Sequence, residues 1–115
     1  MNQPEAMVVS ILIEAPIALL LARFSSKEGL WMVPLVAIAA TLITHPFAWW
    51  ANVGLMPYLS SFPRISLVET GVFLVEGLVF SIGASWSLRK GMLISFLANL
   101  ASTLFGVAWF RWIAA

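Results

Sequence analysis

Two glutamates, Glu14 and Glu76, are the residues of this sequence whose type and setting could do chemistry. Each is a lone carboxylate near the middle of an apolar stretch long enough to cross a bilayer. An ionisable group is costly in the hydrocarbon core, and those found there commonly serve ion or proton pathways. If the two carboxyl groups approach each other, we expect them to share one proton at neutral pH, because like charges repel. Such a pair suits proton coupling, and it equally suits a structural link between two helices.

Three further polar side chains and one proline accompany these acids. Asn99 is at mid-span, so its amide needs a buried partner, and either glutamate could supply one. Pro16 removes a backbone donor, which predicts a kink near residues 12–14 and a freed carbonyl beside the first carboxylate. That kink serves either a polar site or helix packing. His45 and Glu69 have similar depths near one membrane boundary, so we predict a hydrogen bond between their side chains.

The sequence contains no pattern for enzyme chemistry or metal binding. It has no cysteine and one histidine, which excludes disulfides, thiolate metal sites and a bis-histidine haem within the chain. It shows no nucleophile paired with a base, no glycine-rich phosphate loop and no zinc-protease motif. Its net charge is +1 and its basic residues do not cluster, so we expect no nucleic-acid partner. We predict no enzyme activity, no metal and no evident cofactor.

The composition requires a membrane as the solvent for most of this chain. Of 115 residues, 62% are hydrophobic and 10% are charged, and the mean hydropathy is +1.00. A water-soluble domain of this size could not bury so much apolar surface. Helices satisfy their own backbone groups in lipid and need about 20 residues to cross about 30 Å of hydrocarbon. We predict one all-α transmembrane domain over residues 1–115, with four spans near 6–23, 29–50, 66–86 and 91–112.

Turn residues and tryptophans mark the ends of these spans. Polar turns are expected at residues 25–29 and 88–91, and a longer link at 51–65 contains the helix breakers Pro57 and Pro63. Tryptophans flank both ends of the spans, as in the aromatic belts of membrane proteins. Those beside the short turns are Trp31 and Trp86, and those at the opposite ends are Trp49, Trp50, Trp109 and Trp112.

Basic residues set the expected orientation. The short turns carry Arg23, Lys27, Arg89 and Lys90, whereas the other side carries Arg64 and Arg111. By the positive-inside rule, we predict a multi-pass protein of the inner or plasma membrane with both short turns in the cytoplasm and both termini outside. Residues 1–6 contain no Lys or Arg, so no signal peptide is expected and the first span should remain in the mature protein.

The sequence predicts two copies of one helical hairpin. When the sequence is aligned with itself so that the two glutamates match, residues 7–50 meet residues 69–112 without a gap. The informative identities involve scarce residue types: Glu14/Glu76, Gly29/Gly91, Thr41/Thr103 and Trp50/Trp112. Because each copy holds two spans, orientation is preserved. We therefore predict parallel repeats related by an axis along the membrane normal.

A stripe of small and polar side chains runs along the fourth predicted span. Its members follow at spacings of three or four residues, so they share one helical face. They are Ser95, Asn99, Ser102 and Gly106. The repeat pairs them in the second span with Val33, Ala37, Ala40 and Thr44. Small side chains let membrane helices approach closely. We predict that the second and fourth spans meet, or face the glutamate-bearing spans, through these stripes.

These features leave two functions open. Minimal loops and scarce polar groups favour a non-catalytic accessory or structural subunit of a larger membrane complex. Its apolar faces would contact lipids, other membrane subunits or embedded pigments. The alternative is a proton- or cation-coupled transporter or channel for a small solute, acting as a homo-oligomer, in which Glu14, Glu76, Asn99 and Pro16 form the midplane site. The sequence favours the subunit over the transporter.

Overall fold

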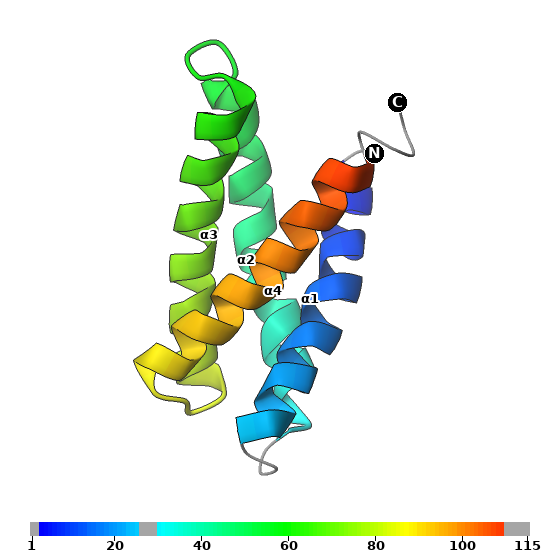
Figure 1. Ribbon diagram of the computed structural model, residues 1–115, viewed down its shortest axis with the longest axis vertical. Helices are drawn as coiled ribbons and strands as arrows, with labels where there is room; N and C mark the ends of the chain where they lie inside the picture. Colours follow the sequence, from blue (N-terminus) through cyan, green and yellow to red (C-terminus); the bar gives the residue numbers. More distant parts are fainter. Residues whose placement is uncertain (1–2, 26–29, 110–115) are drawn as a thin grey trace.

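The computed structural model describes residues 3–25 and 30–109 and consists there of four long α-helices that run up and down in a bundle (Figure 1). Helix α1 covers Gln3–Ser25, α2 covers Met32–Leu55, α3 covers Ser61–Gly83 and α4 covers Leu88–Ala108. The described residues contain no strand. All four helices are long and apolar enough to cross a membrane. The predicted all-α membrane fold is therefore confirmed, whereas the internal repeat remains a prediction.

The boundaries of the helices differ from the predicted ones. Residues 88–91, which were predicted as a polar turn, form the first turn of α4. Helix α2 continues to Leu55, and α3 begins at Ser61, so the predicted link over residues 51–65 shrinks to the turn between these two residues. Pro63 does not break α3, because it lies in the first helical turn, where its missing N–H needs no partner. At the other end, α3 stops at Gly83 and is followed by Ser85 with a positive φ of 56°.

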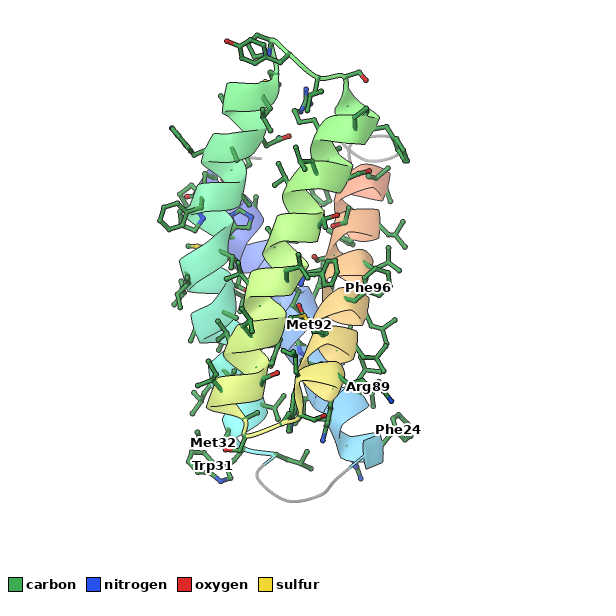
Figure 2. The ribbon with its side chains drawn as sticks, turned by 90° about the vertical axis from the view of Figure 1, so that its left-hand side faces the viewer. Phe24, Trp31, Met32, Arg89, Met92 and Phe96 are labelled. Carbon is green, nitrogen blue, oxygen red and sulfur yellow. The ribbon has the colours of Figure 1, made fainter. Side chains whose placement is uncertain are left out.

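Several predicted boundary residues lie outside the described residues. They are Lys27 and Gly29 in the first short turn and Arg111 and Trp112 after α4. The described tryptophans lie at both ends of the bundle, as predicted for an aromatic belt. Figure 2 shows Trp31 and Arg89 at the end that carries the short turns. At that end Trp86 stacks on Phe80, with ring centroids 5.5 Å apart, and Lys90 Nζ lies 4.7 Å from the centroid of the Trp86 ring.

The helices form a closed ring in which each packs on its neighbours in sequence and α1 also packs on α4. Helices α2 and α4 are therefore diagonal, as are the glutamate-bearing helices α1 and α3. The small-residue stripes face α1 and α3, which was the second of the two predicted arrangements. Their buried members are Val33, Ala37, Ala40 and Thr44 on α2 and Ser95 and Asn99 on α4. Among the described residues, nothing approaches Gly106 closely enough to make it a packing contact.

Apolar packing is concentrated in the half of the bundle nearer the short turns. Small side chains of α1 lie there against α2, which lets the two helices approach closely. The buried residues of this core are Ala15, Ala18, Ala22, Val33, Val36, Ala37, Phe80 and Ile94. The buried polar side chains follow towards the middle of the membrane. Packing in this apolar half thus holds each helix at the rotation about its own axis that turns the polar side chains into the bundle.

Two glycines bring α3 and α4 together at the end near their short turn. A Cβ atom on Gly91 would come within 2.6 Å of the Gly77 carbonyl oxygen and 3.1 Å of the Ser81 nitrogen. A Cβ atom on Gly77 would come within 3.1 Å of Met92 Cα, and Figure 2 shows Met92 at this crossing. Figure 1 shows the two helices diverging from here towards their other ends.

We expect Gly91→Ala to destabilise the bundle, because the new methyl group would push against backbone atoms that cannot rotate away. Overpacking of this kind costs about 1–3 kcal/mol. Thermal unfolding in a mild detergent measures the loss. Gly71→Ala is the matched control, since a Cβ atom on Gly71 of α3 has no neighbour within 4 Å among the described residues. Equal midpoints for both variants would contradict the close approach.

Candidate functional site

Glu14 of α1 is buried in the centre of the bundle and accepts one hydrogen bond on each carboxyl oxygen. Thr41 Oγ1 of α2 donates to Oε2 at 2.8 Å. Ser102 Oγ of α4 donates to Oε1 at 2.8 Å. The side chain is held at both ends of its carboxyl group, with only 4% of the residue exposed. A charged or polar group so buried requires such partners.

Glu76 of α3 is held in the same way from the same two helices. Thr44 Oγ1 of α2 donates to Oε1 at 2.6 Å, and Asn99 Nδ2 of α4 donates to Oε2 at 2.9 Å. Only 2% of Glu76 is exposed. Asn99, for which either glutamate was a possible partner, therefore pairs with Glu76. Each carboxyl group takes one donor from α2 and one from α4, so the network connects all four helices.

The Asn99 amide is fixed by its own helix. Its Nδ2 atom also contacts the Ser95 carbonyl oxygen at 2.8 Å and Ser95 Oγ at 3.3 Å. Ser95 Oγ in turn donates to the Phe73 carbonyl oxygen of α3 at 2.8 Å. These contacts orient the amide with a donor towards Glu76. Ser95 is thus a polar support for the network as well as a small packing residue.

The donors to both glutamates are neutral. Three are hydroxyl groups and one is an amide, and the described residues place no basic side chain against either carboxyl group. The two carboxyl groups are nonetheless bound within one helical turn of each other, by Thr41 and Thr44 on α2 and by Ser102 and Asn99 on α4. Within the described residues every buried side-chain nitrogen and oxygen has a hydrogen-bond partner. The network is therefore complete in hydrogen bonds but has no counter-ion in the described part of the chain.

Two of the hydroxyl groups face a second acceptor. Thr44 Oγ1 lies 2.9 Å from the Ala40 carbonyl oxygen, and Ser102 Oγ lies 3.1 Å from the Asn99 carbonyl oxygen. A hydroxyl group has one proton to donate and lone pairs with which to accept. Each of these two hydroxyls can therefore donate either to its glutamate or to a backbone carbonyl.

The predicted pair of His45 and Glu69 is wrong, because the two side chains point to different helices. His45 lies on the face of α2 towards α1, where Gln3 Nε2 is 3.4 Å from its Nδ1 and its ring stacks with Trp49 at 6.3 Å. Glu69 lies on the face of α3 towards α4, within hydrogen-bonding reach of Thr103. The two residues share a depth in the membrane, but the rotation of α2 and α3 separates them.

For Pro16, a polar site and helix packing were both predicted as possible roles. It lies within α1, which continues from Gln3 to Ser25. Its side chain is exposed and so is that of Leu12, one turn earlier, where the freed carbonyl was expected. Pro16 supplies no group to the glutamate network. Proline is tolerated in membrane helices, and this one lies on the exposed face of α1.

A pocket of about 390 Å³ opens between α3 and α4 where the two helices diverge. Its walls are mainly apolar, and its polar groups include the Glu69 and Thr103 side chains and Asn99. Asn99 thus borders the pocket and also donates to Glu76. No cluster of three or more His, Cys, Asp or Glu residues suited to a metal ion occurs in the described ranges.

Thr41 belongs to the network but was not predicted from the sequence as a site residue. Thr44 and Ser102 were predicted as packing residues, although their hydroxyls bind the glutamates. A signal was present: Thr41 and Thr44 are spaced by three residues, so two hydroxyls share one face of α2. Side chains that are both small and polar fit a packing role and a hydrogen-bonding role equally well.

Comparison of the chain with protein-family models, with curated proteins and with solved structures finds no match. What the described residues show is a small polytopic membrane protein. At its centre two buried carboxyl groups are bound by neutral donors from two helices.

Proposed function

We propose that this protein is a small proton-coupled membrane transporter in which Glu14 and Glu76 bind and release protons as a solute crosses the bilayer. The supporting observation is that the hydrogen bonds around both glutamates can be satisfied whether the carboxyl group is protonated or ionised. A site that exchanges protons must be stable in both states. A fixed structural link needs only one.

The contacts of Glu76 illustrate this property. In the ionised state, Thr44 and Asn99 both donate to the carboxylate. When Oε1 carries a proton, it can donate to Thr44 Oγ1, while the Thr44 hydroxyl turns its own proton to the Ala40 carbonyl oxygen. Asn99 continues to donate to Oε2. Rotation of one hydroxyl group is the only adjustment required, and no side chain is left without a partner.

The contacts of Glu14 allow the same exchange. Protonated Oε1 can donate to Ser102 Oγ, whose own proton then turns to the Asn99 carbonyl oxygen. Thr41 continues to donate to Oε2. In both cases the switching hydroxyl has its second acceptor on its own helix. The two glutamates therefore have equivalent proton-exchange geometry.

Among the described residues, no basic side chain neutralises the two glutamates, and this favours the binding of a proton or a cation. Two ionised carboxyl groups that interact with each other in a membrane would carry two uncompensated charges, which is costly. A proton or a cationic solute would lower that cost. A cationic solute bound near the pair would favour release of a proton from it, and a bound proton would disfavour the solute, which couples the two movements.

Solute-driven proton movement in proteoliposomes tests the proposal. The full chain would be reconstituted with a pH-sensitive dye inside the vesicles, and a panel of small amines, amino acids, sugars and inorganic cations would be added outside. We expect at least one class to change the internal pH, and we expect empty vesicles not to respond to that class. If no class changed the internal pH, the proposal would be wrong.

A second candidate is the accessory subunit that the sequence favoured. Its specific support is that at most 33% of the most apolar window of any helix is buried within the bundle. Large exposed side chains such as Phe47, Trp50 and Phe62 remain available to a partner protein or to lipid. A mild-detergent pull-down of the tagged chain with mass spectrometry distinguishes the two. A stoichiometric partner together with an absence of solute-driven proton movement would support the subunit.

A further inference from the structure

The pocket between α3 and α4 combines aromatic walls with a single acid. Phe62 and Phe73 of α3 and Phe96 of α4 line it, and the rings of Phe73 and Phe96 meet edge to face with centroids 5.5 Å apart. Glu69 is the one carboxyl group in the lining. Its volume of about 390 Å³ lies in the range of small-molecule sites. Aromatic faces and a carboxylate both attract a positively charged nitrogen.

No basic side chain among the described residues neutralises Glu69. The basic residue of α3, Arg64, is directed away from it: its Nε donates to Asn52 Oδ1 at 2.7 Å and its Nη1 to the Leu59 carbonyl oxygen at 3.3 Å. The neutral Thr103 side chain lies with Glu69 in the pocket lining. The carboxyl group is therefore available to balance the charge of a ligand in the pocket.

We propose that this pocket binds an organic ammonium ion, with its charged nitrogen beside Glu69 and its apolar body against the three phenylalanines. Ser66 and Thr70 also line the pocket, but its walls are mainly apolar, so an organic cation with an apolar body is a better match than a hydrated inorganic cation, which needs six or more oxygen ligands. The pocket opens at the side of the bundle, where an apolar ligand can enter from the bilayer. The binding site stands on this geometry alone, whereas its role as a transport site rests on the function proposed above.

Asn99 connects this pocket to the proton-exchanging network. Asn99 is a lining residue of the pocket, and its Nδ2 atom donates to Glu76 Oε2. Glu69 and Glu76 lie on the same side of α3, two helical turns apart. A cation beside Glu69 would therefore act on the charge of Glu76 as well. The pocket supplies the solute site, and the glutamate pair supplies the proton site.

A pair of probes of nearly equal shape tests the ligand class. Benzyltrimethylammonium carries a permanent charge, and neopentylbenzene is its neutral carbon isostere. Binding would be measured in lipid nanodiscs containing the full chain by the chemical shifts of ¹⁵N-labelled Phe73 and Phe96, with free concentrations corrected by partition into empty nanodiscs. No pH gradient is applied, so failure of proton coupling does not affect the result. We expect the cation to bind at least about tenfold more tightly than its isostere.

Variants test whether the probes bind in this pocket. Glu69→Gln should remove most of the preference for the cation, and Leu100→Trp should weaken both probes by filling the pocket while leaving Glu69 in place. Glu5→Gln, which changes an exposed acid at the start of α1, should bind as the wild type does. Equal affinities of the two probes for the wild type would show an apolar lipid-chain site instead. A charge preference that survives Glu69→Gln, or cation binding that survives Leu100→Trp, would overturn the proposal.

Discussion

The double variant Glu14→Gln/Glu76→Gln is expected to fold like the wild type and to lose all solute-driven proton movement. A glutamine amide is close to a protonated carboxyl group in shape, and its NH₂ group can replace the carboxyl O–H as the donor. In Glu76→Gln, the amide oxygen would accept from Asn99 and the NH₂ group would donate to Thr44, whose proton turns to the Ala40 carbonyl oxygen. The variant is thus fixed in the equivalent of the protonated state.

Two measurements on the same preparation distinguish a loss of proton coupling from a loss of folding. Thermal unfolding should change by less than about 1 kcal/mol, because each hydrogen bond is replaced by another. The internal pH of proteoliposomes should no longer respond to the solute that moves protons in the wild type. Glu5→Gln is the control for a change of acid to amide outside the network. A double variant that retained the full pH response would exclude Glu14 and Glu76 as the coupling groups.

Replacement of Thr44 by valine is expected to damage both stability and coupling, whereas replacement by serine should preserve most of each. Valine has the shape of threonine but no hydroxyl group, so Glu76 Oε1 would lose its partner at 2.6 Å. A buried polar atom left without a partner costs about 1–3 kcal/mol. Serine keeps the hydroxyl and the second acceptor on Ala40. The expected difference between the two variants therefore depends on the hydroxyl group, which serine keeps and valine lacks.

Thermal unfolding and solute-driven proton movement would be measured for both Thr44 variants. The expected order is wild type, then Thr44→Ser, then Thr44→Val, in both assays. If Thr44→Val were as stable and as active as Thr44→Ser, the hydroxyl group would have no role in either property. Thr44 would then be a packing residue, as predicted from the sequence. If serine failed like valine, the methyl group of Thr44 would be required as well as its hydroxyl group.

The sequence was informative about depth in the membrane. Each helical residue advances by about 1.5 Å, so the position of a polar residue within an apolar span gives its level directly. Glu14, Glu76 and Asn99 were recognised for this reason, and the structure places Asn99 and Glu76 in contact. The four helices themselves follow from composition, because no other regular structure of this chain length satisfies its backbone groups in lipid.

The sequence was less informative about rotation around the helix axes. His45 and Glu69 have similar depth, yet one faces α1 and the other faces α4. Nothing in a single sequence fixes that rotation, since it depends on how the alanines of α1 pack on α2 and how Gly77 and Gly91 bring α3 and α4 together. The helices diverge at the other end, and the pocket beside Glu69 that lies there had no sequence signal of its own.

Infrared difference spectroscopy on a pH change tests most directly whether the buried glutamates exchange protons. The carbonyl stretch of a protonated carboxyl group is separate from the bands of carboxylate and amide groups, and it can be recorded from hydrated films of the protein in lipid. We predict a difference band in the wild type that decreases more in Glu14→Gln/Glu76→Gln than in Glu5→Gln, while Glu69 and the other carboxyl groups still contribute in every variant. An identical spectrum from the wild type and the double variant would show that the pair holds a fixed number of protons, and the network would then be a structural link between helices.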